Sequence, residues 1–178
     1  GDGDSLSNAV KRNAPHLLGL GPVEALANEM TGILQSQKIQ AIRSATTAMQ
    51  MIEVELEAKG VSFGSLRVSA TGEIFEDAIA GIDTDLVVRP FGWKGRYASL
   101  REIVEFSFRA HLGIRSAFLQ QRIKEGELDD KLFGTGPWYD IDDDGVSVEI
   151  EDGMITSVAA YLAQLSIPQL RPPTHPRL

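Results

Sequence analysis

The stretch "PVEALANEMTGILQSQKIQAIRSATTAMQMIEVELEAKGVSFGSLRVSATG", residues 22–72, carries the pattern that decides the fold. Pro22 suits the first turn of a helix, and apolar residues then recur at three- and four-residue spacing up to Leu34. A second pattern of this kind runs from Ile39 to Leu56, with Gly60 placed as a helix C-cap. We therefore predict two helices, or one helix bent near Ser36.

From Val61 the apolar residues follow a period of two, which predicts a half-buried strand over residues 61–72. Residues 73–84 contain a second short strand or a ligand-binding loop. A third strand is predicted from Asp85 to Arg89, because Pro90 would end it. These segments together predict a small antiparallel sheet.

The second half of the chain is predicted to be helical. Ser99 and Glu102 have the spacing of a capping box, and the helix that they begin would stop at Gly113. Further helices are expected over about 117–132 and 154–165. The predicted fold class is α+β, mainly helical with a small antiparallel sheet, in a single domain over residues 15–165. Residues 1–14 form a polar lead-in, and residues 166–178 form a Pro-rich tail or linker.

Composition excludes several classes of function. The chain has 178 residues, 43% of them hydrophobic, a formal net charge of −8 and a pI near 4.9. Nucleic-acid binding draws on clustered Lys and Arg, so no nucleic-acid partner is expected. No apolar run approaches the roughly 20 residues that cross a bilayer, so no membrane span is expected.

The sequence contains no cysteine. This absence removes disulfides, thiolate catalysis, Cys-ligated zinc and covalent haem attachment through C-x-x-C-H. The sequence also lacks a Walker loop and H-E-x-x-H. We therefore assign no catalytic residue and expect no enzymatic activity of the isolated chain.

An acidic loop, "DIDDDGVSVEIE", occupies residues 140–151 and matches the twelve-residue calcium template. A hard divalent cation takes six to eight oxygen ligands, and a sharp turn at the glycine lets alternate carboxylates converge. The upstream "FGTGPWY" is no entering helix, so a freestanding calcium loop is predicted rather than an EF-hand. Glu149 is a rival to Glu151 as the closing ligand, and a solvated acidic turn is the alternative to a metal site. The predicted ligands are the side chains of Asp140, Asp142, Asp144 and Glu151 and the carbonyl of Val146.

The stretch "PFGWKGRYASLREIVEFSFRAHLGIRS", residues 90–116, resembles a signature of the bacterial di-haem oxidoreductases. These proteins, also called thiol oxidoreductases, are related to di-haem cytochrome c peroxidases. The matching positions are residues 91–94, then Leu100 with Arg101, then Gly113 with Ile114. Residues 12–31 and the acidic loop are similar to other segments of the same family. The resemblance covers about residues 15–165.

The resemblance implies a haem-associated module. Family members attach haem through C-x-x-C-H motifs that flank this region, so the chain is either the middle of a longer cytochrome or a relative without haem. Electron transfer would be carried by flanking cytochrome c domains of the same or a neighbouring chain, in the periplasm or outside the cell. The competing function is a non-catalytic, calcium-stabilised interaction domain without a redox role.

The candidates for haem contact under this resemblance are Trp93, Lys94, Arg96 and His111, and Arg89 is an alternative to the two basic residues. The indole of Trp93 can lie against a porphyrin edge, while Lys94 and Arg96, or Arg89, can pair with haem propionates. His111 could project toward a docked haem. The alternatives are that Trp93 fills the core beneath the basic side chains, and that His111 is favoured at a helix C-terminus by the macrodipole.

Overall fold

The computed structural model describes residues 16–126, 145–146 and 148–169. Within them, a three-stranded antiparallel sheet of order β1-β2-β3 accompanies the helices, which confirms the predicted mainly helical α+β class. The strands are β1 (Ile52–Ala58), β2 (Val61–Val68) and β3 (Ile74–Phe75). The helices are α1 (Leu20–Ala48), α2 (Leu100–Ser107), the π-helix η2 (Phe108–Leu112), α3 (Ala117–Lys124) and α4 (Asp152–Gln164).

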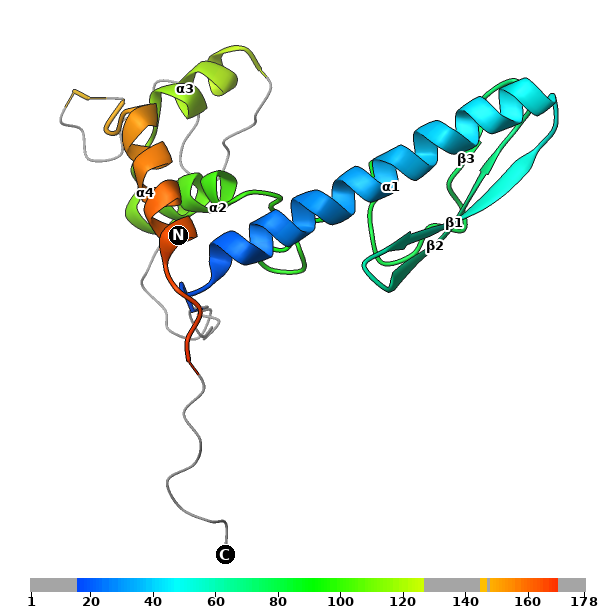
Figure 1. The fold of residues 1–178 in the computed structure, drawn as a ribbon. Coiled ribbons are helices and arrows are strands. Elements are labelled where there is room, and N and C mark those ends of the chain that lie inside the picture. The colour runs from blue at the N-terminus through cyan, green and yellow to red at the C-terminus, as the bar shows by residue number, and fades with distance from the viewer. Residues whose placement is uncertain (1–15, 127–144, 147, 170–178) are drawn as a thin grey trace, which may run out of the picture.

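Helix α1 runs from α2 and α4 at one end of the described structure to the sheet at the other (Figure 1). Its 29 residues span about 43 Å at 1.5 Å per residue. The sheet lies against the C-terminal part of this helix, whereas α2 and α4 lie at its N-terminal end. The same helix therefore contributes to two separate groups of packed elements.

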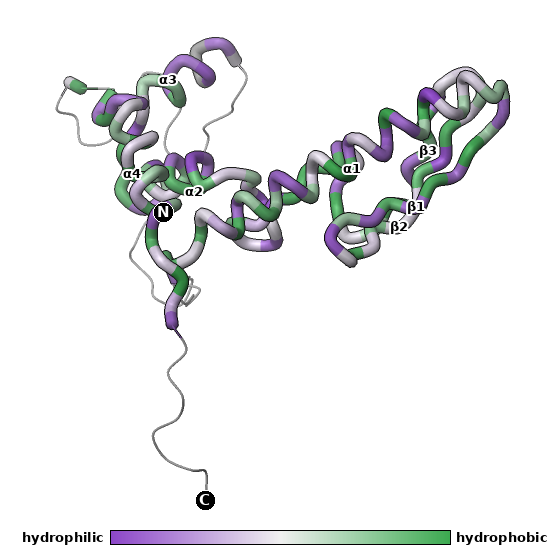
Figure 2. The backbone as a smooth tube through the Cα atoms, viewed as in Figure 1, coloured by the Kyte–Doolittle hydropathy of each residue, from purple (hydrophilic) through white to green (hydrophobic). Residues whose placement is uncertain are grey.

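The larger core lies between α1 and the sheet. Hydrophobic residues of β1 alternate with glutamates, and the buried residues of β1 and β2 form one cluster with those of α1. Figure 2 shows hydrophobic stretches of the chain on α1 and on the strands beside it. Burial of this apolar surface is the main source of stability for this part of the fold. The buried members of the cluster are Met30, Leu34, Ala41, Ala45, Leu56, Ala58, Phe63, Leu66, Val68 and Leu86.

Close backbone contact joins the N-terminal end of α1 to α4. A Cβ built on Gly21 would lie 2.1 Å from the carbonyl oxygen of Ala163, so only glycine allows the two helices to approach this closely. Gly19 donates its N–H to the carbonyl of Leu165 at 3.1 Å. The Glu24 carboxylate accepts the first N–H of α2, from Leu100, at 2.9 Å.

The prediction of a helix through Leu56 is wrong, because α1 ends at Ala48 and residues 52–58 form β1. Met49 adopts a left-handed conformation, with φ of 52°, and stops the helix. Ile52 and Leu56 are four residues apart, which satisfies helical spacing, but the whole segment also alternates with a period of two. Gly60 belongs to the β1–β2 turn and caps no helix.

The two-helix alternative is also wrong, because α1 is one helix from Leu20 to Ala48 without a break at Ser36. The Ser36 hydroxyl donates to the carbonyl of Gly32, four residues earlier, at 2.7 Å, so the side chain bonds within the helix and does not end it.

No strand forms from Asp85 to Arg89, so that prediction is wrong as well. The Asp85 carboxylate accepts the N–H of Val87, and Thr31 of α1 accepts the N–H of Val88. Side chains thus take the N–H groups that a ladder would need.

The prediction for residues 99–113 is confirmed. Ser99 and Glu102 form a reciprocal capping box at the start of α2. The helix continues into η2 and ends at Gly113, with φ of 74°. The last helix is also present as α4, two residues longer at its start than predicted. The predicted helix over 117–132 is present only as α3, which ends at Lys124 because residues 125–126 form a turn with a left-handed Gly126. Residues 127–132 lie outside the described residues, as do residues 1–14 and 170–178.

Candidate functional site

The turn from Phe91 to Tyr97, "FGWKGRY", is closed by its own backbone. Phe91 donates its N–H to the carbonyl of Tyr97 at 3.1 Å and accepts the N–H groups of Tyr97 and Arg96 at 3.0 and 2.9 Å. The two ends therefore pair like a minimal antiparallel bridge. This closure fixes the positions of the side chains between them.

Two glycines make the turn possible. A Cβ on Gly92 would lie 2.7 Å from the ring of Tyr97, and one on Gly95 would lie 2.7 Å from the carbonyl oxygen of Arg89. Both glycines have positive φ, and so does Lys94 between them, at 59°. A non-glycine residue in this region is strained, and such strain is often found at functional positions.

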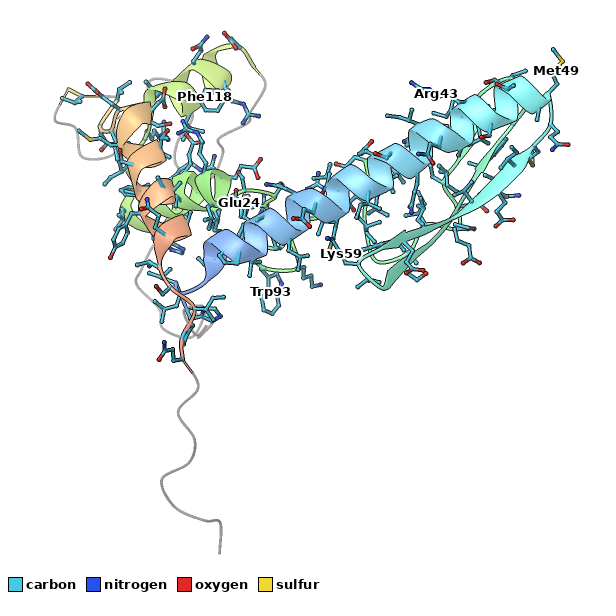
Figure 3. The ribbon with its side chains drawn as sticks, viewed as in Figure 1. Glu24, Arg43, Met49, Lys59, Trp93 and Phe118 are labelled. Carbon is cyan, nitrogen blue, oxygen red and sulfur yellow. The ribbon has the colours of Figure 1, made fainter. Side chains whose placement is uncertain are left out.

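Two aromatic residues of the turn, Phe91 and Trp93, differ in their exposure to solvent. Phe91 is buried and anchors the turn, whereas the Trp93 side chain is 70% exposed. Figure 3 shows Trp93 pointing away from α1. The alternative in which Trp93 fills the core is therefore wrong. Lys94 and Arg96 are exposed beside it.

An aromatic row continues from the turn onto α2 and η2. We define the aromatic row as Tyr97, Phe106 and His111: the first two ring centroids are 5.1 Å apart, and His111 meets Phe106 edge-on at 6.1 Å. Arg96 lies over the Tyr97 ring and Arg109 over the Phe106 ring, at 5.8 and 6.0 Å. The row connects the turn to His111.

Burial and helix geometry shape this row. Burial raises the pKa of the Tyr97 hydroxyl above its ordinary value. His111 is exposed in the π-helix η2. Helices of this type are rare in proteins, and those that occur are often found at functional sites. The aromatic row is therefore partly buried at Tyr97 and exposed to solvent at His111.

A cavity of about 280 Å³ lies next to the turn. Arg89 lines it but is paired: its guanidinium binds the Asp85 carboxylate with both terminal nitrogens and lies 3.4 Å from Asp83. The hydrogen bond from Arg89 lowers the pKa of the Asp85 carboxyl below its usual value. Lys94, for which the described residues offer no ion-pair partner, also lines the cavity. Of the two cations, Lys94 is better placed to meet an external anion.

The structure thus places three of the four predicted haem-contact residues in one turn and connects the fourth to that turn through ring contacts. Trp93, Lys94 and Arg96 share the turn, and His111 lies at the far end of the aromatic row. Sequence reasoning missed Tyr97 and Arg109. Tyr97 is the last residue of "FGWKGRY", so its place in the turn could have been predicted from the sequence. The contact of its ring with Phe106 depends on tertiary packing.

The predicted calcium ligands Asp140, Asp142 and Asp144 lie outside the described residues. Of the remaining two, Val146 is exposed and Glu151 precedes α4 without a side-chain capping bond. The described part of the chain contains no group of three acidic or histidine side chains that could hold a metal ion. Gly145 has φ of 87°, the left-handed conformation that a sharp turn at this position needs.

A polar core between α2, α3 and the residues before α4 was also missed. Arg115 is 1% exposed, and Ser116 and Gln120 are also buried. The Ser116 hydroxyl donates to the Glu105 carboxylate, and the Glu149 carboxylate accepts the N–H of Arg115 at 2.7 Å. Glu149, the rival closing ligand for calcium, therefore has a structural contact of its own.

Comparison of the chain with protein-family models, with curated proteins and with solved structures finds no match. Within the described residues, no helix has the length and apolar character that a membrane span requires.

Proposed function

We propose that the 91–97 turn and the aromatic row form a docking face for a haem that flanking cytochrome c domains carry. The observation that supports this proposal most is the largely exposed Trp93 on a backbone-closed turn between two glycines, with Lys94 and Arg96 beside it. Tryptophan is enriched at interfaces, because its ring offers a large apolar contact and its N–H a polar one. The resemblance to di-haem oxidoreductases supplies the class of partner.

The chemistry of a haem edge matches this face. A porphyrin is a flat apolar ring with two carboxylates, so an indole can lie against the ring while cations pair with the propionates. The chain has no cysteine and cannot bind haem through thioethers. Its proposed role is therefore to contact a haem attached to another domain, in the same or a neighbouring chain, in the periplasm or outside the cell. No catalysis by the isolated chain is proposed.

Tryptophan fluorescence tests this proposal directly. The sequence has two tryptophans, so in a Trp138→Phe variant Trp93 is the sole indole reporter. We expect saturable quenching when this variant is titrated with a short peptide that carries a covalently attached c-type haem. Lys94→Glu in the same background should weaken binding about tenfold, because an attractive contact becomes a repulsive one.

A matched control separates this effect from net charge. Arg43 is exposed on α1, and Figure 3 shows it far from Trp93. Arg43→Glu changes the charge by the same amount and should leave the haem titration unchanged. Quenching that is absent, or that Arg43→Glu weakens as strongly as Lys94→Glu does, would count against docking at the turn.

A calcium loop is the second candidate, and the left-handed Gly145 favours it. Calcium that binds only the native state raises the melting temperature, by an amount equivalent to about 2.7 kcal/mol at a concentration 100 times Kd. We expect a higher midpoint in millimolar calcium, and no such rise in an Asp142→Asn/Asp144→Asn variant. Circular dichroism melts of each variant with and without calcium measure this.

The same melts identify the closing ligand. The Glu149 carboxylate already accepts the Arg115 N–H, so Glu151→Gln should reduce the calcium shift more than Glu149→Gln does. Each shift is taken relative to the calcium-free melt of the same variant, because Glu149→Gln also alters a structural contact. An unchanged midpoint for the unmodified protein would leave the loop as a solvated acidic turn.

A further inference from the structure

β1 is an edge strand of the sheet, and some of its backbone N–H and C=O groups point away from β2. Lys59 and Gly60 both have positive φ, at 54° and 80°, which defines a two-residue hairpin turn. Ala58 and Val61, which flank this turn, therefore exchange hydrogen bonds. The pairing has a β-bulge between Glu55 and Glu57, and its extra residue is on β2, so β1 keeps the regular alternation of a strand. The N–H and C=O groups of residues 53, 55 and 57 therefore point away from β2.

Two contacts agree with this assignment. The Gln37 side-chain amide of α1 donates to the Glu57 carbonyl at 2.9 Å and accepts the Glu57 N–H at 3.3 Å, as a neighbouring strand would. On β2, Ser65, the partner of Glu55, donates its N–H to Ala78 on the side away from β1. The outward direction of residues 53, 55 and 57 thus follows from both strands.

Gln37 covers the edge at one residue only. Among the hydrogen bonds of the described residues, none involves the outward N–H or C=O groups of Glu53 or Glu55. Four backbone groups are therefore available over one short segment. Unpaired edges of this kind accept an added strand unless something opposes it.

The side chains at this edge determine what can be added. Glu53, Glu55 and Glu57 all point to solvent, and Met51, two residues before them, is 56% exposed. Within the described structure, neither Glu55 nor Glu57 forms a salt bridge. A second copy of β1 would place further glutamates against these, and like charges in neighbouring strands are destabilising. Charge therefore disfavours self-pairing and favours a basic segment.

We propose that the β1 edge binds an extended basic peptide segment of a protein partner as an additional strand. Backbone groups of Glu53 and Glu55 would pair with the segment, and Lys or Arg at alternate positions would face the three carboxylates. A shallow hollow of about 640 Å³ on α1, lined by Gln37 among others, lies where the segment would pass Glu57. The Lys59–Glu29 ion pair, at 2.6 Å, joins the rim of this hollow to the hairpin turn.

Fluorescence anisotropy with a labelled eight-residue peptide, alternating Lys and Thr, tests the proposal on the full chain. We expect saturable binding that a Glu53→Lys/Glu55→Lys variant weakens at least tenfold. The control Glu73→Lys/Glu125→Lys changes two other exposed glutamates and the same net charge, and should leave affinity within about twofold. Circular dichroism of both variants verifies that the sheet has formed.

Backbone pairing is tested by changing the peptide and not the protein. The unmodified protein is used throughout, so the result does not depend on the folding of a variant. N-methylation at alternate residues removes the N–H groups that would face β1, and methylation of the other set removes those that face solvent. Binding should fall at least tenfold in one set and little in the other. Equal effects of the two sets, equal affinity for both protein variants, or no binding by the unmethylated peptide would overturn the proposal.

Discussion

Replacing Leu34 with alanine should lower the free energy of unfolding by about 3 to 5 kcal/mol. Leu34 has no exposed surface and belongs to the cluster between α1 and the sheet. Removing its branched end loses transfer free energy and leaves a cavity that the surrounding side chains fill only in part. Urea denaturation followed by circular dichroism measures the change.

The matched control for this substitution is on the same helix. Leu26 is 47% exposed on α1, so Leu26→Ala makes an identical chemical change outside the core and should cost about 0.5 kcal/mol or less. Both changes replace leucine by alanine in a helix, so the difference between them reports burial. Similar losses for the two variants would mean that α1 does not pack on the sheet as described.

The second large effect is expected for Gly64→Ala in β2. Gly64 has φ of 79°, and a Cβ there would lie 2.0 Å from the carbonyl oxygen of Ala78. That carbonyl accepts the N–H of Ser65, so moving it would break the contact between β2 and the segment after β3. Left-handed strain plus the collision should cost about 3 kcal/mol or more.

Gly60→Ala separates the two causes of this cost. Gly60 has nearly the same φ, at 80°, but nothing lies within 4 Å of its added Cβ. Its substitution therefore costs only the conformational strain, about 1 kcal/mol. Thermal and urea unfolding of both variants give the comparison. If Gly60→Ala were as damaging as Gly64→Ala, the close approach of residue 78 would be refuted.

The parts of the fold that depend on residues close together in the sequence were predicted correctly. The Ser99–Glu102 capping box and the stop at Gly113 depend on a few neighbouring residues, and both were predicted correctly. The start of the strand at Val61 was also predicted, because the pattern there begins after a glycine and has no competing helical period, but the strand ends at Val68 and not at residue 72. These features needed no knowledge of tertiary contacts.

The wrong predictions came from segments where local patterns are ambiguous. Ile52 and Leu56 satisfy both a helical and a strand period, and the left-handed Met49 that ends α1 has no sequence signal, because it is not glycine. Val87 and Val88 are β-branched and favour strands, yet side chains of Asp85 and Thr31 take their N–H groups. Contacts 57 residues apart, such as Thr31 with Val88, are invisible to periodicity.

The candidate site was only partly predictable for the same reason. Trp93, Lys94 and Arg96 are neighbours in sequence, so their shared turn could be expected. The aromatic row joins Tyr97 to His111 through Phe106, and that depends on how the turn lies against α2. The exposure of Trp93 likewise depends on Phe91 taking the buried position.

The dual role of α1 bears on how the protein can be dissected. One helix supplies Leu34 to the core against the sheet and Gly21 to the contact with α4. A fragment that keeps α1 with the sheet would leave the α4-facing turn of the helix bare, and a fragment without α1 would leave the inner face of the hairpin unprotected from water. Limited proteolysis should therefore trim surface segments without releasing two autonomous folding units.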